Sequence, residues 1–257
     1  MAIITLLTDS GESDHYVAAI KAKIISANPG ILVVDISHQI KPSDIGHAAF
    51  VLRAVFRDFP KGTVHLVGVH STSNRGEAFV ALQLEDHFFV GPDNGIFGLI
   101  SDQPHQQLIE INTTDAVPTT FPERDVFAMA AAKIASGKSL NDLGTPIPSF
   151  RKMIDRQVKA TKKQISGTVV RVDNFGNLIT NIPKIAFDTL SRGKAFTIQF
   201  GGEKFRRIHT LYNQAEEGEC FMVFNSLGVL EIGINKGNAS ELLGLSYDST
   251  VTIMFEE

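Results

Sequence analysis

The stretch Thr5-Leu6-Leu7-Thr8-Asp9-Ser10-Gly11-Glu12-Ser13-Asp14-His15-Tyr16-Val17 predicts a strand end, a short polar loop and the start of a helix. The apolar run stops at Thr8-Asp9, and helical spacing begins near Asp14. In open parallel sheets ligands bind at the carboxyl ends of strands, which is where Asp9 is expected. Its carboxylate can accept hydrogen bonds from two vicinal hydroxyls, such as those of a ribose. The alternative is that Asp9 caps the next helix or tightens the turn, because Asp is a preferred N-cap residue.

The residues that follow predict strands alternating with helices. Helical spacing covers residues 14 to 27, and a second helix is expected from Asp44 to about Asp58. Near-continuous apolar runs at 31 to 36 and 63 to 69 predict two more strands, the first of them buried on both faces. This β-α-β-α-β order predicts an α/β domain with a mainly parallel sheet.

The pattern changes in the second half of the chain. A strand from Glu77 to Leu84 with a hairpin partner and a helix from Asp125 to Ser136 complete the first half. Beyond residue 163 the chain shows short strands at regular spacing, which are typical of a small antiparallel barrel or sandwich. We therefore expect an α/β N-terminal domain (1–150), a linker (151–163) and an all-β C-terminal barrel (164–257).

Composition narrows the function classes. The net charge of -4 argues against nucleic acid as the main partner. The basic stretch 151–163 is interpreted as a solvated linker, with a phosphate- or nucleic-acid-binding patch as the alternative. There is no signal peptide pattern, and no apolar stretch approaches the ~18 residues of a membrane span, so a cytoplasmic protein is predicted. Cys220 lies in an apolar run and is expected to be a buried, unreactive thiol rather than a nucleophile.

The motifs of many enzyme classes are missing from the sequence. It contains no CxxC pair, HExxH, GxSxG, Walker loop or GxGxxG. The histidines are scattered, so no metal site is predicted. The remaining candidates are polar loops, and turn chemistry alone explains each of them when it is taken singly. These loops are 8–14, 70–75, 119–125, 173–177, 225–228 and 235–240.

Together and in this order, the polar segments resemble the S-adenosylmethionine (SAM) hydroxide adenosyltransferase family, which also contains SAM-dependent fluorinases and chlorinases. The resemblance covers nearly the whole chain. It implies an N-terminal α/β domain, a C-terminal β-barrel and a homotrimer that binds SAM between subunits. The motifs that carry it are Thr8-Asp9-Ser10-Gly11 with Asp14, Asp35-Ile36-Ser37-His38 with Asp44, Phe59-Pro60-Lys61-Gly62-Thr63-Val64-His65, Pro92-Asp93-Asn94-Gly95, Phe121 with Arg124-Asp125, and Asp173-Asn174-Phe175-Gly176-Asn177 with Thr180-Asn181.

The resemblance assigns roles to individual residues. It implies that Asp9 holds the ribose hydroxyls and that Phe121 packs beside the ribose. It also implies that Asn177 and the backbone of Asn238-Ala239 meet the adenine. The methionine part is expected at Asp14, Asp173 and Ser226. SAM is the expected substrate, with no cofactor and no metal. The complete predicted substrate-binding set is Asp9, Ser10, Asp14, Phe121, Asp173, Phe175, Asn177, Ser226, Asn238 and Ala239.

The family reaction is a substitution at the ribose 5′ carbon of SAM. Methionine leaves as a neutral molecule and needs no general acid, so the site has to place the nucleophile in line and remove its water. In the hydrolase branch the nucleophile is water or hydroxide, and the products are adenosine and methionine. In the halogenase branch the nucleophile is a halide.

The chain departs from the hydrolase pattern at an Asp-Arg-His set. His70 stands at the position of the Asp, the loop after it is shortened around Arg75, and Pro122 replaces the His. We predict that His70, Arg75 and Glu123 are catalytic, with His70 orienting or deprotonating water and Glu123 or Arg75 holding the imidazole. Glu123 stands where halogenases have a small residue, and its charge would repel a halide.

Three hypotheses remain open for the function. The first is SAM hydrolysis with a rebuilt water site. The second is another nucleophile, halide or otherwise, on the same scaffold. The third is a non-catalytic protein that binds SAM or adenosine. For His70 alone, the alternative is a polar loop residue held by hydrogen bonds to backbone.

Overall fold

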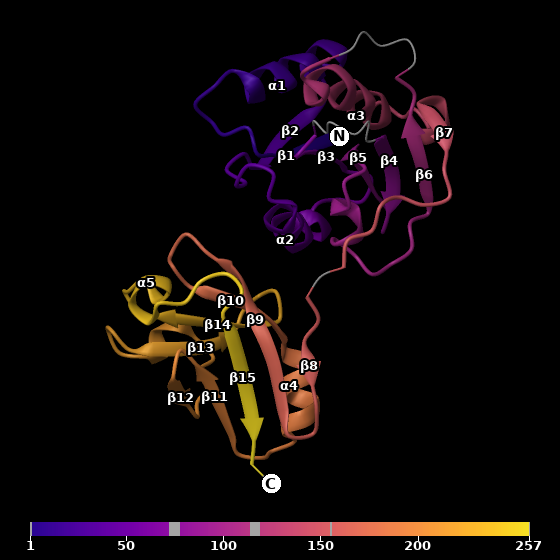
Figure 1. Cartoon of the computed structure of the whole chain (residues 1–257). Coiled ribbons are helices and arrows are strands. Elements are labelled where there is room, and N and C mark those ends of the chain that lie inside the picture. Colours follow the sequence, from indigo (N-terminus) through magenta and orange to yellow (C-terminus); the bar gives the residue numbers. More distant parts are fainter. Residues whose placement is uncertain (1, 72–77, 114–118, 155, 257) are drawn as a thin grey trace. The chain divides into compact units, whose positions relative to one another are not determined.

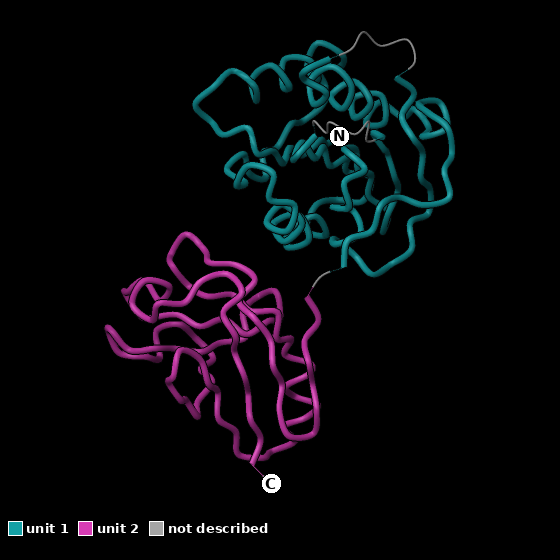
Figure 2. The backbone as a smooth tube through the Cα atoms, viewed as in Figure 1, with its two compact units in different colours: residues 1–154 teal, residues 155–257 magenta. Residues whose placement is uncertain are grey.

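A computed structural model describes residues 2–71, 78–113, 119–154 and 156–256. The chain forms two compact units, Met1–Ile154 and Asp155–Glu257 (Figure 2). Each unit has its own hydrophobic core.

The N-terminal unit is built on a seven-stranded mixed sheet of order β2-β1-β3-β5-β4-β6-β7 (Figure 1). Neighbouring strands run parallel from β2 to β5 and antiparallel from β5 to β7, which confirms an α/β unit. Thr8 pairs with Gly68, so the carboxyl ends of β1 and β3 lie side by side. The strands are β1 (Ile3–Thr8), β2 (Leu32–Ser37), β3 (Val64–Gly68), β4 (Phe79–Leu84), β5 (His87–Pro92), β6 (Gln107–Ile111) and β7 (Gly144–Pro146).

The prediction that the second strand is buried on both faces is wrong. β2 is the first strand of the sheet order, and its residues are half-buried or exposed. Leu32, for example, is 41% exposed. An apolar run shows that a strand is favoured, but it does not show whether the strand has neighbours on both sides.

Helices cover both faces of this sheet (Figure 1). Residues of α1 (Tyr16–Ala27) and α3 (Ala128–Ala135) share a core cluster with Ile4 and Leu6 of β1, whereas α2 (Ile45–Val55) shares the other cluster with Leu7. The period-two alternation of β1 therefore places its side chains in two different cores. Short helical turns occur at Phe56–Asp58, Ile96–Gly98, Glu123–Phe127 (a π-helix) and Leu140–Asp142.

The C-terminal unit is a curled antiparallel sheet of order β12-β11-β15-β9-β10-β14-β13, with β8 paired to β9. The prediction of a barrel holds only in part: in the described residues β12 and β13 do not pair, and an isolated bridge from His209 to Val223 links this region. β12 has three residues, which is too short for a continuous ladder. The elements are β8 (Lys159–Ala160), β9 (Gln164–Val172), β10 (Leu178–Pro183), α4 (Lys184–Ser191), β11 (Phe196–Phe200), β12 (Glu203–Phe205), a 3-10 turn (Tyr212–Gln214), β13 (Cys220–Phe224), β14 (Val229–Ile234), α5 (Ala239–Leu243) and β15 (Thr250–Phe255).

Cys220 is half-buried on β13, and burial raises the pKa of its thiol, which favours the unreactive protonated form. Among the helices that the structure describes, none is both long and apolar enough to span a bilayer.

Candidate functional site

Asp9 connects three loops at the carboxyl edge of the N-terminal sheet. Its backbone N–H donates to the Gly68 carbonyl at 3.3 Å. One carboxylate oxygen, Oδ2, accepts hydrogen bonds from the backbone N–H groups of Ser43 (2.9 Å) and His70 (3.2 Å). Helix α1 begins at Tyr16 with His15 as its N-cap, which excludes the alternative that Asp9 caps this helix. The Asp9 carboxylate is held at the place where parallel sheets bind ligands.

Glu123 is a buried carboxyl group beside Asp9. It begins the π-helical turn before α3 and is 9% exposed. A Cβ atom added to Gly68 would lie 2.5 Å from Glu123 Cγ, so the side chain of Glu123 packs against this glycine. Burial raises the pKa of Glu123; the Ser71 hydroxyl opposes this shift and the charge of Asp9 adds to it. The site therefore contains an acidic group whose proton affinity is higher than that of a free carboxylate.

The backbone of His70 is fixed beside Asp9. Its φ of 51° lies in the left-handed region, which is uncommon for a residue other than glycine. The backbone N–H is held by Asp9, and the preceding carbonyl of Val69 accepts a hydrogen bond from Asn94 Nδ2 at 2.9 Å. Ser71 lies next to the Glu123 carboxyl, although its hydroxyl oxygen is buried without a hydrogen-bond partner among the described residues. The predicted catalytic residue Arg75 lies outside the described residues.

A second group of polar side chains supports the loop that carries Asp9. Thr8 Oγ1 lies 2.9 Å from His38 Nδ1, and His38 Nε2 lies 3.1 Å from Asp35 Oδ1. Burial of Asp35 acts to raise its pKa, but Lys21 and His38 outweigh this and hold it below its usual range. The His38 carbonyl accepts a hydrogen bond from the Gly11 N–H at 2.8 Å. These contacts attach the loop that carries Asp9 to β2 and the residues that follow it.

The other predicted residues of the N-terminal unit lie at or near the surface. The Phe121 ring meets Tyr16 edge-on, with centroids 5.3 Å apart, and the Arg124 guanidinium lies 5.3 Å from the Phe121 centroid. Ser10 is half-buried, and its backbone N–H reaches Thr8 Oγ1 at 3.4 Å. Asp14 is exposed.

The C-terminal unit has a cavity of about 560 Å³ that brings four of the predicted substrate-binding residues together. This volume falls in the range of roughly 300–1,000 Å³ that is typical of small-molecule sites. Aromatic rings and carboxylates share its walls. The lining residues are Asp173, Phe175, Asn177, Tyr212, Phe221, Glu231, Ile234, Asn235, Lys236, Gly237 and Asn238.

Local turn chemistry builds this cavity. Asp173 Oδ1 accepts the backbone N–H groups of Phe175 (2.9 Å) and Asn177 (2.8 Å). Gly176 has a φ of +82°, and a Cβ there would lie 2.1 Å from Asn238 Oδ1, so glycine permits this close approach. Asn238 caps α5 through the Glu241 N–H at 3.2 Å. The side chain of Ala239 is buried in the core, which leaves its backbone for any contact with a ligand.

Comparisons with known proteins identify the family. The SAM hydroxide adenosyltransferase N-terminal domain matches residues 4–144, and the C-terminal domain of the same family matches residues 167–252. The chain belongs to this family. It is 32% identical to the (R)-S-adenosyl-L-methionine hydrolase of Methanocaldococcus jannaschii, over 98% of this chain and 96% of the relative. Identity to the protein of the same name from Thermus thermophilus is 31%, over 99% and 100%.

More distant relatives and a solved structure agree with this assignment. A fluorinase of Actinoplanes sp. is 24% identical over 98% of this chain and 97% of the relative. The crystal structure of an uncharacterized conserved protein from Thermotoga maritima superposes with a TM-score of 0.90 at 30% identity, over 98% of this chain and 99% of that one. The SAM hydroxide adenosyltransferase fold is thus present over almost the full chain.

Seven of the eleven residues that line the cavity lie outside the predicted substrate-binding set, and Glu231 is the buried acid among them. Glu231 is 4% exposed and lies in the middle of the apolar strand β14. The available signal was a lone acidic residue within the run Val229-Leu230-Glu231-Ile232-Gly233-Ile234. Ser226, in contrast, was predicted to bind the substrate but lies in an exposed turn and does not line the cavity.

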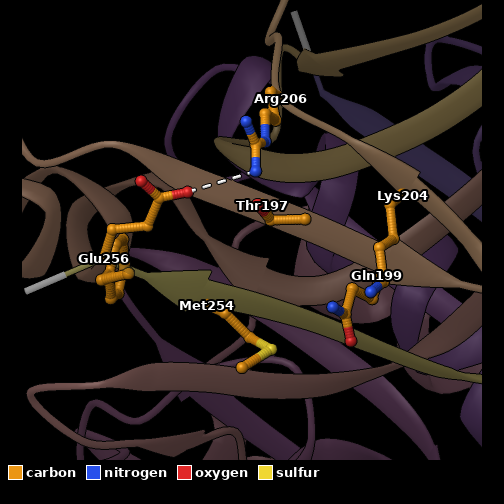
Figure 3. A pocket seen from close by; sticks show the side chains of 7 residues that line it. Thr197, Gln199, Lys204, Arg206, Met254 and Glu256 are labelled. Carbon is orange, nitrogen blue, oxygen red and sulfur yellow. Dashed lines mark ion pairs between the residues drawn. The ribbon is translucent and has the colours of Figure 1, made fainter.

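A second concavity, of about 370 Å³, contains none of the predicted residues (Figure 3). It lies on β11, β12, β15 and the residues next to them, where Arg206 pairs with Glu256 at 3.5 Å. Lys204, Arg206 and Met254 are exposed. Its side chains are those of an ordinary polar surface, so no chemistry is assigned to it.

Replacing Gly68 by Ala is expected to move Glu123 and lower activity at least tenfold, with a stability loss of about 1–3 kcal/mol, because the new methyl group overlaps Glu123 Cγ. Gly46→Ala is the control, since its Cβ would meet Asp44 at an ordinary 3.6 Å within helix α2. Turnover and thermal unfolding of both variants check this. Full activity in a folded Gly68→Ala protein would show that the position of Glu123 is unimportant.

Proposed function

We propose that this chain hydrolyses S-adenosyl-L-methionine to adenosine and L-methionine by attack of water on the ribose 5′ carbon. The observation that carries the proposal is the buried Glu123 carboxyl group, whose pKa is raised, next to Asp9 at the carboxyl edge of the sheet. Its relatives of about 30% identity, which are named (R)-S-adenosyl-L-methionine hydrolases, support it. The (R) epimer at sulfur is therefore the first substrate to test.

The proposed reaction needs a base but no acid. As the water oxygen bonds to the 5′ carbon, the carbon–sulfur bond breaks and its electron pair stays on sulfur, giving the neutral thioether of methionine. The water proton passes to the Glu123 carboxylate and from there to solvent. A base whose pKa is raised toward neutral takes this proton more readily than an ordinary carboxylate does. His70 and Ser71 would orient the water from the loop after β3.

The geometry disfavours a halide as the nucleophile. Asp9 and Glu123 are both acidic, and their charges interact. Where either is ionised, it repels an anion, whereas water is neutral and can donate a hydrogen bond. The homotrimer, the cytoplasmic location and the absence of a cofactor stay predictions.

Incubation of the full-length protein with (R)- and (S)-SAM in ¹⁸O-labelled water tests the proposal. We expect adenosine that carries the label at its 5′ oxygen, together with unlabelled methionine, because attack at carbon places the water oxygen on the ribose. Chromatography with mass spectrometry reads both products. A 5′-halogenated nucleoside in the presence of chloride or fluoride would assign the protein to halogenation. SAM binding by calorimetry without any product would assign it to binding alone.

A further inference from the structure

Glu231 is the most deeply buried acidic side chain of the cavity in the C-terminal unit. It is 4% exposed, and burial raises its pKa. Its two oxygens accept hydrogen bonds from two different amides: Asn177 Nδ2 at 3.1 Å and Asn225 Nδ2 at 2.9 Å. Glu231 thus connects the loop after β9 to the turn between β13 and β14.

The orientation of the Asn177 amide follows from its neighbours. Its Nδ2 donates to Glu231 Oε1 at 3.1 Å and to Asp173 Oδ2 at 3.2 Å. An ionised carboxylate only accepts hydrogen bonds, so an amide between two carboxylates has to turn its NH₂ group toward them. The amide oxygen then faces the other way, toward Gly233, where an added Cβ would lie 2.4 Å from it. Within the described residues, no donor hydrogen-bonds to this oxygen, and Asn177 lines the cavity.

Asn225 cannot turn as easily as Asn177. Its Oδ1 accepts the backbone N–H groups of Leu227 (3.0 Å) and Val229 (3.4 Å), while its Nδ2 donates to Glu231. Reversing this amide would break two backbone contacts of the turn, whereas reversing Asn177 would break one further contact, to Asp173. Any change in the hydrogen-bonding character of Glu231 is therefore expected to appear at Asn177.

We infer that Glu231 sets the hydrogen-bond polarity of the cavity, by holding Asn177 so that its amide oxygen accepts a hydrogen bond from an amino group on the bound ring. The inference rests on the proposed function, in which that ring is the adenine of SAM. A ring with an amino group at this position donates a hydrogen bond to the Asn177 amide oxygen. A ring with an oxo group instead places its own acceptor oxygen next to that amide oxygen, and the two repel each other. Glu231 is a positioning residue, because it acts on the ring through Asn177.

The consequence is a preference for a 6-aminopurine over a 6-oxopurine. Adenosine and inosine share the ribose and the purine frame. They differ at the 6 position, an amino group in one and an oxo group in the other, and in the hydrogen on N1 that only inosine carries, so comparing them reports on the hydrogen bonds along this edge of the ring. A site built around a hydrogen bond rejects the wrong partner strongly, because the buried acceptor is left unpaired. We expect the wild-type chain to bind adenosine at least about 100-fold more tightly than inosine.

The test is isothermal calorimetry of both nucleosides with the full-length protein and with Glu231→Gln. Three groups surround this side chain, the amides of Asn177 and Asn225 and the hydroxyl of Tyr212, and a hydroxyl can turn to accept from the new NH₂ group or to donate to the remaining oxygen. Because two backbone N–H groups hold Asn225, Asn177 is the amide that we expect to turn. Asn177 then presents NH₂ to the cavity, so the adenosine-to-inosine ratio is expected to fall at least tenfold. Glu203→Gln, which removes an exposed acid on β12, is the control and should keep the wild-type ratio. Should Glu231→Gln fail to fold, Glu231→Asp, whose shorter carboxylate loosens its hold on Asn177, should lower the ratio in the same direction.

The ratio of adenosine affinity to inosine affinity shows whether Glu231 orients Asn177 or only stabilises the fold. A structural defect weakens both nucleosides equally and leaves their ratio unchanged, and that result would overturn the inference. Equal binding of adenosine and inosine by the wild-type protein, or binding of neither, would overturn it as well. Failure of the proposed function has a different signature: a wild-type preference for adenosine that Glu231→Gln loses, with no adenosine formed from SAM.

Discussion

Glu123→Gln is expected to lower kcat for SAM cleavage by roughly 10²–10⁴, the usual contribution of a general base, while the Kd for SAM changes less than about threefold. Gln has almost the same shape as Glu but cannot take a proton from water. Glu110→Gln, at an exposed position on β6 of the same unit, is the matched control and should retain full activity. Single-turnover kinetics and calorimetry separate the chemical step from binding.

The pH profile gives Glu123 a second signature. Burial raises the pKa of Glu123 above its ordinary 4.5, so the wild-type rate should rise with pH through this raised value and then level off. The rate of Glu123→Gln should not show this rise with pH.

The same pKa shift predicts that the wild-type chain loses stability as the pH rises through the raised pKa, because the folded protein disfavours the charged carboxylate. Glu123→Gln should therefore unfold at a higher temperature than wild type at pH 8. Wild-type turnover in the variant would refute the assignment of the base.

Acidification is expected to destabilise the N-terminal unit strongly because of a buried histidine pair. His65 Nδ1 lies 2.7 Å from Thr5 Oγ1, and His65 Nε2 lies 3.2 Å from His87 Nδ1. The rings of Phe56 and Phe89 pack against His65. Burial, with a smaller effect of His87, lowers the pKa of His65 from 6.5 to about 3. Burial also lowers the pKa of His87.

The direction of the effect follows from proton binding. Below pH 6.5 the unfolded chain binds a proton at His65 that the folded chain does not bind until about pH 3. Stability is therefore fully present above pH 6.5 and is lost as the pH falls, by on the order of 5 kcal/mol in total for this one residue. Between pH 7.5 and 5.0 the expected loss is about 2 kcal/mol, and His87 adds to it in the same direction.

Urea unfolding followed by circular dichroism at pH 7.5 and 5.0 measures this loss. His65→Gln removes the titrating ring, and its free energy of unfolding should depend less on pH than that of wild type, by about the same 2 kcal/mol. His15→Gln, at an exposed position, should keep the wild-type pH dependence. An unchanged pH dependence in His65→Gln would show that another group controls acid unfolding.

The local elements of the fold could be predicted because they depend on neighbouring residues. The apolar run from Ile3 to Leu7 indicates a strand, and in the structure its side chains enter two cores. Helical spacing likewise predicted α1 to within a few residues. The burial of β2 and the closure of the barrel were not predictable in this way, because both depend on which strands pair over long distances.

The sequence by itself also determined the family, through the order of its polar loops, and with it the residues proposed to bind SAM. Only the tertiary structure decided the surroundings of Glu123 and Glu231, and with them the pKa shifts of these two carboxyl groups. Glu123 meets Gly68 and Asp9 because β1 and β3 are neighbours in the sheet, and Glu231 meets Asn177 because β14 pairs with β10. The pKa of a carboxyl group and the direction of an amide depend on burial and on nearby donors and charges. Those neighbours are far apart along the chain, and folding brings them together.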